Sequence, residues 1–199
     1  MEKRISRILT DYRETIKPLL SDIKARNGGG LPNNFLNEIR ALNDHIARCY
    51  RQDITQQNID AELTKAEGHL RRLVYDCFKQ LNIYISDTLA LKEKRFYSDL
   101  WLTHNEGKFW KEYSKNRKYA QINVIEAKKA ESIDPDKAMT LYEKAFQNYR
   151  HAEDLLIENK RMLWNSFLYK NLHKINHFWW WLLITVVLSA ISAIIGIFW

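Results

Sequence analysis

The segment Leu63–Tyr84 reads LTKAEGHLRRLVYDCFKQLNIY, and its apolar side chains recur at intervals of about three or four residues. The recurring positions are Leu63, Ala66, Leu70, Leu73, Cys77, Leu81 and Tyr84. An α-helix brings residues at this spacing onto one face. Because the spacing is close to a heptad repeat, it predicts a long helix that packs lengthwise against a partner helix.

The chain on both sides of this segment has the same helical character. Only 6 Gly and 3 Pro occur in 199 residues, which favours long helices over strands and tight turns. Helices are expected at about 2–26 with a bend at Pro18, 34–52, 55–103 with a bend near 82–87, 108–132, and from 136 onward. The loop NGGGLPNN (27–34) is expected to end with Asn33 or Asn34 as a helix cap. Residues 1–177 are therefore predicted to form one all-α bundle of about five helices.

The C-terminal segment 178–199 reads FWWWLLITVVLSAISAIIGIFW and contains no charged residue. As a helix it would be about 33 Å long, against a hydrocarbon core of about 30 Å. The basic residues before it are Lys160, Arg161, Lys170 and Lys174. This charge bias predicts a single C-terminal transmembrane helix in contact with membrane lipid, with the N-terminal domain 1–177 in the cytoplasm.

The same segment carries small and hydroxyl side chains at helical spacing, namely Thr185, Ser189, Ser192 and Gly196. Small residues one turn apart allow helices to approach closely in lipid, so this stripe would suit self-association around a channel. Such residues are also common in lone membrane anchors. Both interpretations stay open at this point.

Charge gives a further candidate surface. The chain has a formal net charge of +7, and a basic cluster lies at Lys108, Lys111, Lys115, Arg117 and Lys118, interleaved with aromatic residues. Cations and stacking rings together suit single-stranded RNA, and the same composition suits anionic lipid headgroups. The alternative is an amphipathic helix whose rings are core and whose lysines are solvated.

Other chemistry has little support in the sequence. The two cysteines, Cys49 and Cys77, lie in apolar helical patterns, which is typical of buried thiols in a reducing compartment. The histidines show no metal-ligand spacing, and no phosphate-binding glycine loop is present, so no metal and no cofactor are expected.

The stretch EIRALNDH (38–45) places Arg40 five residues before His45 on an expected helix. In metal-free RNA cleavage, a histidine moves protons and an arginine stabilises the charge on the phosphorane. These side chains would share a polar edge with Glu38, Asn43 and Asp44. The alternative is purely structural, with Arg40 paired to Asp44 and His45 paired to Glu38.

The sequence LPNNFLNEIRALNDHIARCYR around this motif resembles the motif helix of the HEPN superfamily, in which an acidic residue precedes the Arg and a polar patch ends at the His. Glu38, Arg40 and His45 match that pattern, and Asn43-Asp44-His45 is similar to the ending of many members. Active members usually carry Asn, His, Asp or Lys directly after the Arg, whereas this chain has Ala41. The resemblance therefore implies a HEPN-like fold and favours a structural role for the motif.

A small HEPN-like bundle with one membrane span resembles the membrane accessory proteins of type VI-B, RNA-targeting CRISPR systems. The resemblance implies a homo-oligomeric protein of the bacterial inner membrane that forms a pore and enhances anti-phage immunity. It also implies RNA or the RNA-guided CRISPR nuclease as a partner. The alternative function is a membrane-tethered, metal-independent HEPN ribonuclease that uses Arg40 and His45. A membrane scaffold with neither pore nor chemistry is the third possibility.

Overall fold

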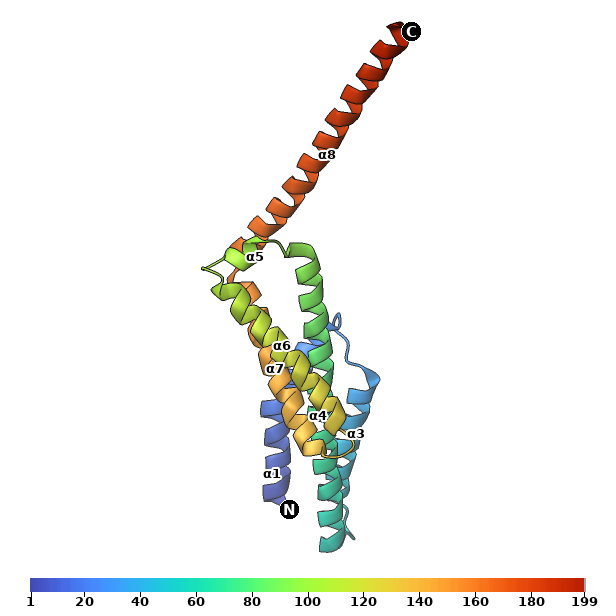
Figure 1. Cartoon of the computed structure of the whole chain (residues 1–199). Coiled ribbons are helices and arrows are strands. Elements are labelled where there is room, and N and C mark those ends of the chain that lie inside the picture. Colours follow the sequence, from blue (N-terminus) through green and yellow to red (C-terminus); the bar gives the residue numbers. More distant parts are fainter. Residues whose placement is uncertain (199) are drawn as a thin grey trace. The chain divides into compact units, whose positions relative to one another are not determined.

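The computed structural model describes the backbone of residues 1–198 and the side chains of 1–172 and 178–189. The elements in chain order are α1 (Glu2–Asp11), η1 (Tyr12–Ile16), α2 (Lys17–Arg26), α3 (Asn33–Arg48), α4 (Gln56–Phe96), α5 (Leu100–Thr103), α6 (Lys108–Ala130), α7 (Pro135–Glu158) and α8 (Lys160–Phe198) (Figure 1). Over the described residues every element is helical, so the predicted all-α class is confirmed.

The chain forms two compact units. The first comprises residues 1–88 and 116–151, and the second comprises 89–115 and the chain from 152 onward. The long helices α4, α6 and α7 each contribute to both units, and each unit is described here by itself.

The first three elements form one helical run over Glu2–Arg26 with a wide turn, η1, just before Pro18. Proline has no backbone N–H and therefore cannot donate to the carbonyl four residues earlier. The N–H of Lys17 donates to the carbonyl of Tyr12, five residues back, which is the π-helical pattern. The expected irregularity at Pro18 is thus a π-turn that precedes it.

The loop after α2 depends on glycine. Gly28 and Gly29 have φ angles of +64° and +96°, in the left-handed region that favours residues without a Cβ. The next helix begins at Asn33 after Pro32, and no side chain caps it. The expectation that Asn33 or Asn34 caps this helix is therefore wrong, since both lie inside its first turn.

The helix α4 contains the opening segment and is the centre of the first unit. Of the seven recurring apolar residues, all except Tyr84 are buried, and they pack with α1, α2 and α3 in one core cluster. Its 41 residues form one helix that is not interrupted at 82–87, where a bend was expected. The reason lies at Asn82, which is 3% exposed and donates from Nδ2 to the carbonyl of Tyr142 instead of interrupting its own helix.

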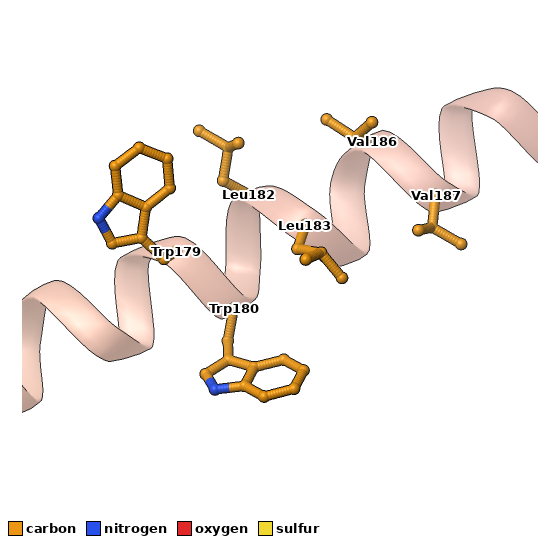
Figure 2. Close-up of a pocket in the computed structure, with 6 residues that line it drawn as sticks. All are labelled: Trp179, Trp180, Leu182, Leu183, Val186 and Val187. Atoms are coloured by element: carbon orange, nitrogen blue, oxygen red, sulfur yellow. The ribbon is translucent and has the colours of Figure 1, made fainter.

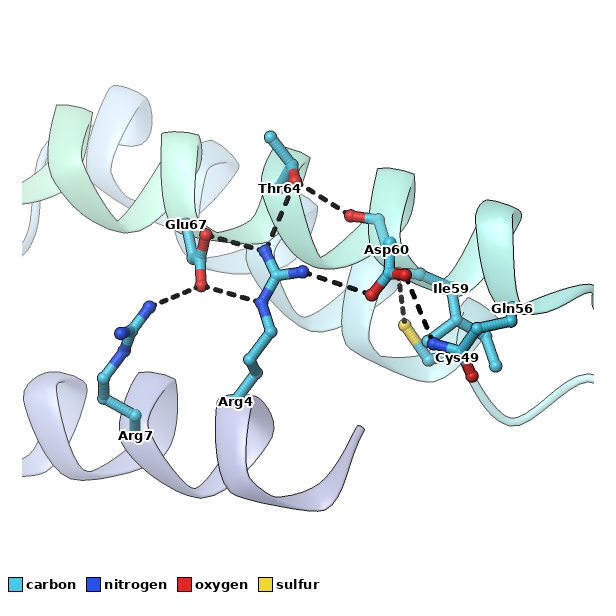
Figure 3. A network of polar contacts seen from close by, with 8 residues as sticks. All are labelled: Arg4, Arg7, Cys49, Gln56, Ile59, Asp60, Thr64 and Glu67. Atoms are coloured by element: carbon cyan, nitrogen blue, oxygen red, sulfur yellow. Dashed lines mark hydrogen bonds and ion pairs between the residues drawn. The ribbon is translucent and has the colours of Figure 1, made fainter.

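A polar network joins α1 to α4 along one edge of this core (Figure 3). Glu67 accepts hydrogen bonds from Arg4 at 2.9 Å and from Arg7 at 2.8 Å. Arg4 also contacts Asp60 at 3.3 Å. The hydrogen bond from Arg4 lowers the pKa of Glu67, so the carboxylate stays ionised and holds the N-terminal helix in place.

The second unit has a core of aromatic rings around Trp101, which is fully buried. Phe109 and Tyr113 make edge-on contacts with Trp101 at centroid distances of 5.5 Å each, and the Tyr113 hydroxyl donates to Glu93. The turn predicted at 104–107 is present, with positive φ at residues 105–107.

The prediction of a membrane-spanning helix at 178–199 is contradicted. Among the residues that the structure describes, no helix is long and apolar enough to cross a membrane. The expected transmembrane architecture, membrane-protein class and inner-membrane location with a cytoplasmic N-terminal domain are corrected accordingly.

The described part of this segment consists of exposed side chains around a single helix (Figure 2). Trp179 and Trp180 are each 60% exposed. In the stripe, Thr185 and Ser189 donate their hydroxyls to carbonyls four residues earlier on the same helix, at 2.9 and 2.8 Å. Ser192 and Gly196 lie outside the residues whose side chains are described.

Candidate functional site

The Arg40/His45 motif lies on α3, which packs against the N-terminal half of α4 within the first unit (Figure 1). Phe35 and Leu42 are the buried residues of α3, and Cys49, which follows its last residue, is buried too, so that buried side chains recur every seven positions. The polar residues Glu38 and His45 have the same spacing and line the edge of this face. On α4 their partners are His69 and Glu62, also seven apart and in reverse order, as two antiparallel helices require.

Glu62 fixes the ring of His45. Nδ1 of His45 lies 2.7 Å from Oε2 of Glu62, and both side chains are 14% exposed. Oε1 of Glu62 accepts from Lys65 at 2.8 Å. The hydrogen bond to His45, followed by that to Lys65, lowers the pKa of Glu62 to about 2. The ionised carboxylate therefore holds the proton of His45 on Nδ1 and leaves Nε2 as the reactive nitrogen.

Nδ1 of His69 also faces a carboxylate, and in addition it faces a guanidinium. Its Nδ1 lies 2.8 Å from Oε2 of Glu38 and 2.8 Å from Nη2 of Arg72, while Nε of Arg72 donates to Glu38 at 3.1 Å. One nitrogen satisfies only one of these partners at a time. It donates to the carboxylate when it carries a proton, and it accepts from the guanidinium when it does not.

The two histidines contact each other directly. Their rings are stacked with centroids 5.1 Å apart and an interplanar angle of 24°. Among the described residues, no hydrogen bond reaches Nε2 of either ring. The site therefore has two imidazoles side by side, each oriented by a carboxylate and each with its second nitrogen free to exchange a proton.

Arg40 lies on the exposed side of α3, and in the described part of the chain it makes no hydrogen bond or ion pair. Asn43 is likewise exposed, whereas Asp44 pairs with Arg48 four residues later. The alternative pairs Arg40–Asp44 and His45–Glu38 do not form, because Arg48 and His69 are better placed to bind the two carboxylates. Arg40 thus remains available to an anion or to another chain.

His69 and Glu62 were missed by the sequence reasoning, and so was Arg72. These residues lie on a different segment from the Arg40/His45 motif, and His69 has no metal-ligand spacing to other histidines. The sequence pattern that could have identified these residues is a shared seven-residue interval between a glutamate and a histidine. It separates Glu38 from His45 in one segment and Glu62 from His69 in the next. Opposite charge types at equal spacing on two antiparallel helices predict two cross-helix pairs.

The predicted basic cluster lies along the helix α6. Lys108, Lys111 and Lys115 belong to the second unit, and Arg117 and Lys118 to the first. The interleaved rings of Phe109 and Tyr113 are buried, at 3% and 0% exposure, while the lysines are exposed. This matches the amphipathic-helix interpretation at those positions.

The structure offers no other obvious reactive group. Within the described residues, no cluster of three or more His, Cys, Asp or Glu side chains is arranged to hold a metal ion. Both cysteines are buried, and burial raises the pKa of Cys49 and raises that of Cys77 to about 12. Such thiols are mostly protonated at neutral pH and are poor nucleophiles.

Comparisons with protein-family models, with curated proteins and with solved structures each found no match.

Proposed function

We propose that this chain is a HEPN-like protein of anti-phage defence that cleaves RNA without a metal ion at the His45 site. The observation that carries the proposal is the histidine held at Nδ1 by an ionised carboxylate, with Nε2 free and an unpaired arginine on the same helix. A pore or channel required the spanning helix and is not part of this proposal.

Metal-free RNA cleavage needs a group that transfers protons and a group that stabilises negative charge, and this site offers both. A general acid–base group accelerates proton transfer by about 10²–10⁴-fold, and a correctly oriented imidazole is the usual choice. A guanidinium stabilises the negative charge that builds up on phosphorus in the transition state. His45 is assigned the first role and Arg40 the second, with Glu62 as the residue that orients His45.

Arg40 and its exposed neighbours favour a second candidate function, in which the motif joins copies of the chain. Leu36 is 46% exposed on the same helix, and Asn43 is exposed one turn beyond Arg40. An unpaired arginine between these residues would suit a polar contact with a second copy. In this case the protein acts as a homo-oligomeric accessory factor, with RNA or the RNA-guided CRISPR nuclease as its partner.

The test is cleavage of a short labelled single-stranded RNA in the presence of EDTA. Wild-type protein is expected to cut it, and His45→Gln and Arg40→Ala are each expected to lose about 10²-fold or more in rate. The matched control is Arg51→Ala, which removes an exposed arginine outside the motif and is expected to cut normally.

The same samples separate the two functions. Light scattering measures the particle mass of each variant. If the variants lose RNA cleavage while their particle mass equals that of wild type, the ribonuclease is supported. If wild type does not cleave RNA and Arg40→Ala has a smaller particle mass than wild type, the assembly role is supported.

A further inference from the structure

We propose that His69 is the second proton-transfer residue of this site, so that one chain supplies both the base and the acid for RNA cleavage. The inference rests on the proposed function and adds a residue from α4 to a motif on α3. The observation behind it is the stack of His45 on His69, with a centroid distance of 5.1 Å and a carboxylate at Nδ1 of each ring.

Acid–base catalysis by two imidazoles needs one neutral ring that takes a proton and one protonated ring that gives a proton. The charged groups that face the pair are Glu38 and Arg48 from α3 and Glu62, Lys65 and Arg72 from α4.

Arg72 sets a condition on the role of His69. Nη2 of Arg72 lies 2.8 Å from Nδ1 of His69, so Nε2 of a neutral His69 can accept a proton only while Nδ1 donates its own proton to Glu38. Beside His45, the guanidinium of Arg48 approaches the carboxylate of Glu62 at 3.9 Å. We assign His69 as the base and His45 as the acid, and the sulfur-linked substrate described below decides between this order and its reverse.

The reaction balances without any further reactant. Nε2 of His69 takes the proton of the 2′-hydroxyl, and the 2′-oxygen forms a bond to phosphorus. The bond from phosphorus to the 5′-oxygen breaks, and that oxygen takes a proton from Nε2 of His45. The products are a 2′,3′-cyclic phosphate and a 5′-hydroxyl, and proton exchange with water restores both rings.

A substrate whose bridging 5′-oxygen is replaced by sulfur separates the two roles, because a thiolate leaves without being protonated. On ordinary RNA, His45→Gln and His69→Gln are each expected to lose about 10²-fold or more. On the sulfur-linked RNA, His45→Gln is expected to recover most of the wild-type rate and His69→Gln to remain impaired. His104→Gln, which loses a hydrogen bond to Asn159 in the second unit, serves as the matched control and is expected to cleave normally.

Some outcomes would overturn the catalytic role of His69 and leave the proposed ribonuclease function intact. If wild type cleaves RNA and His69→Gln cleaves equally fast, His69 has no part in catalysis while the ribonuclease stands. Recovery of His69→Gln on the sulfur-linked RNA reverses the assignment. His69→Phe keeps an aromatic ring beside His45 that cannot transfer a proton. Circular dichroism of this variant shows whether the protein is still folded, so that lost activity is not mistaken for misfolding. Wild type that cleaves neither substrate overturns both proposals.

Discussion

Replacement of Leu42 by alanine is expected to destabilise the first unit strongly, because this residue packs α3 onto α4 beneath the histidine pair. Leu42 is 2% exposed and belongs to the main core cluster, between Glu38 and His45 along α3. Its truncation removes buried carbon atoms and leaves a cavity that the rigid helices fill only in part. The matched control is Leu36→Ala on the same helix, where the leucine is 46% exposed.

The magnitudes follow from the two exposures. A leucine-to-alanine change at a fully buried site costs about 2.7–5 kcal/mol, of which part is the cavity. At Leu36 only about half of the side chain is buried and no cavity results, so the loss is about 1 kcal/mol. For a chain of this size, where 1 kcal/mol shifts the Tm by about 2–4 °C, the larger change lowers the Tm by roughly 5–20 °C.

Urea unfolding followed by circular dichroism measures both variants at constant pH. The expected result is a clear fall in the midpoint for Leu42→Ala and a small one for Leu36→Ala, with unchanged slopes. Equal losses in the two variants would refute the packing of α3 on α4 and, with it, the geometry of the histidine site.

Other expectations concern charge, thiols and a turn. Because the folded pKa of Glu62 is lowered from 4.5 to about 2, its contribution to stability is present above pH 4.5 and is lost as the pH falls toward 2. Unfolding curves of Glu62→Gln should therefore lie below those of wild type at neutral pH and converge with them in acid; parallel curves would contradict this. Cys49 and Cys77 should react with a thiol reagent only in denaturant, and fast reaction of native protein would contradict their burial. Gly107→Ala should lower the unfolding free energy by about 1–3 kcal/mol, since φ is +79° and the new Cβ would lie 3.1 Å from the carbonyl oxygen of Leu102; an unchanged midpoint would argue against this turn.

Sequence reasoning predicted the helical class well because apolar spacing is a local property. Six of the seven spaced residues in 63–84 are buried, and the turn at 104–107 is present. The unbroken α4 was not predictable from its own residues. Asn82 suggests a break in isolation, and only its bond to Tyr142, a residue distant in sequence, explains why the helix continues.

The candidate site was predicted in part. Arg40 and His45 were identified from one helix, but a motif search along a single segment does not say which side chains a packed neighbour supplies. Glu62 and His69 come from the next helix and replace the partners expected within α3. The membrane-spanning prediction is contradicted, since no helix among the described residues is long and apolar enough to cross a membrane.

The ends of the RNA fragments test the central claim most directly. Wild-type protein is incubated with RNA in EDTA, and the products are weighed by mass spectrometry. Attack by the 2′-hydroxyl predicts fragments that end in a 2′,3′-cyclic phosphate and begin with a 5′-hydroxyl, and predicts that His45→Gln forms almost none. Intact RNA, or fragments that begin with a 5′-phosphate, would contradict a ribonuclease built on the His45–His69 pair.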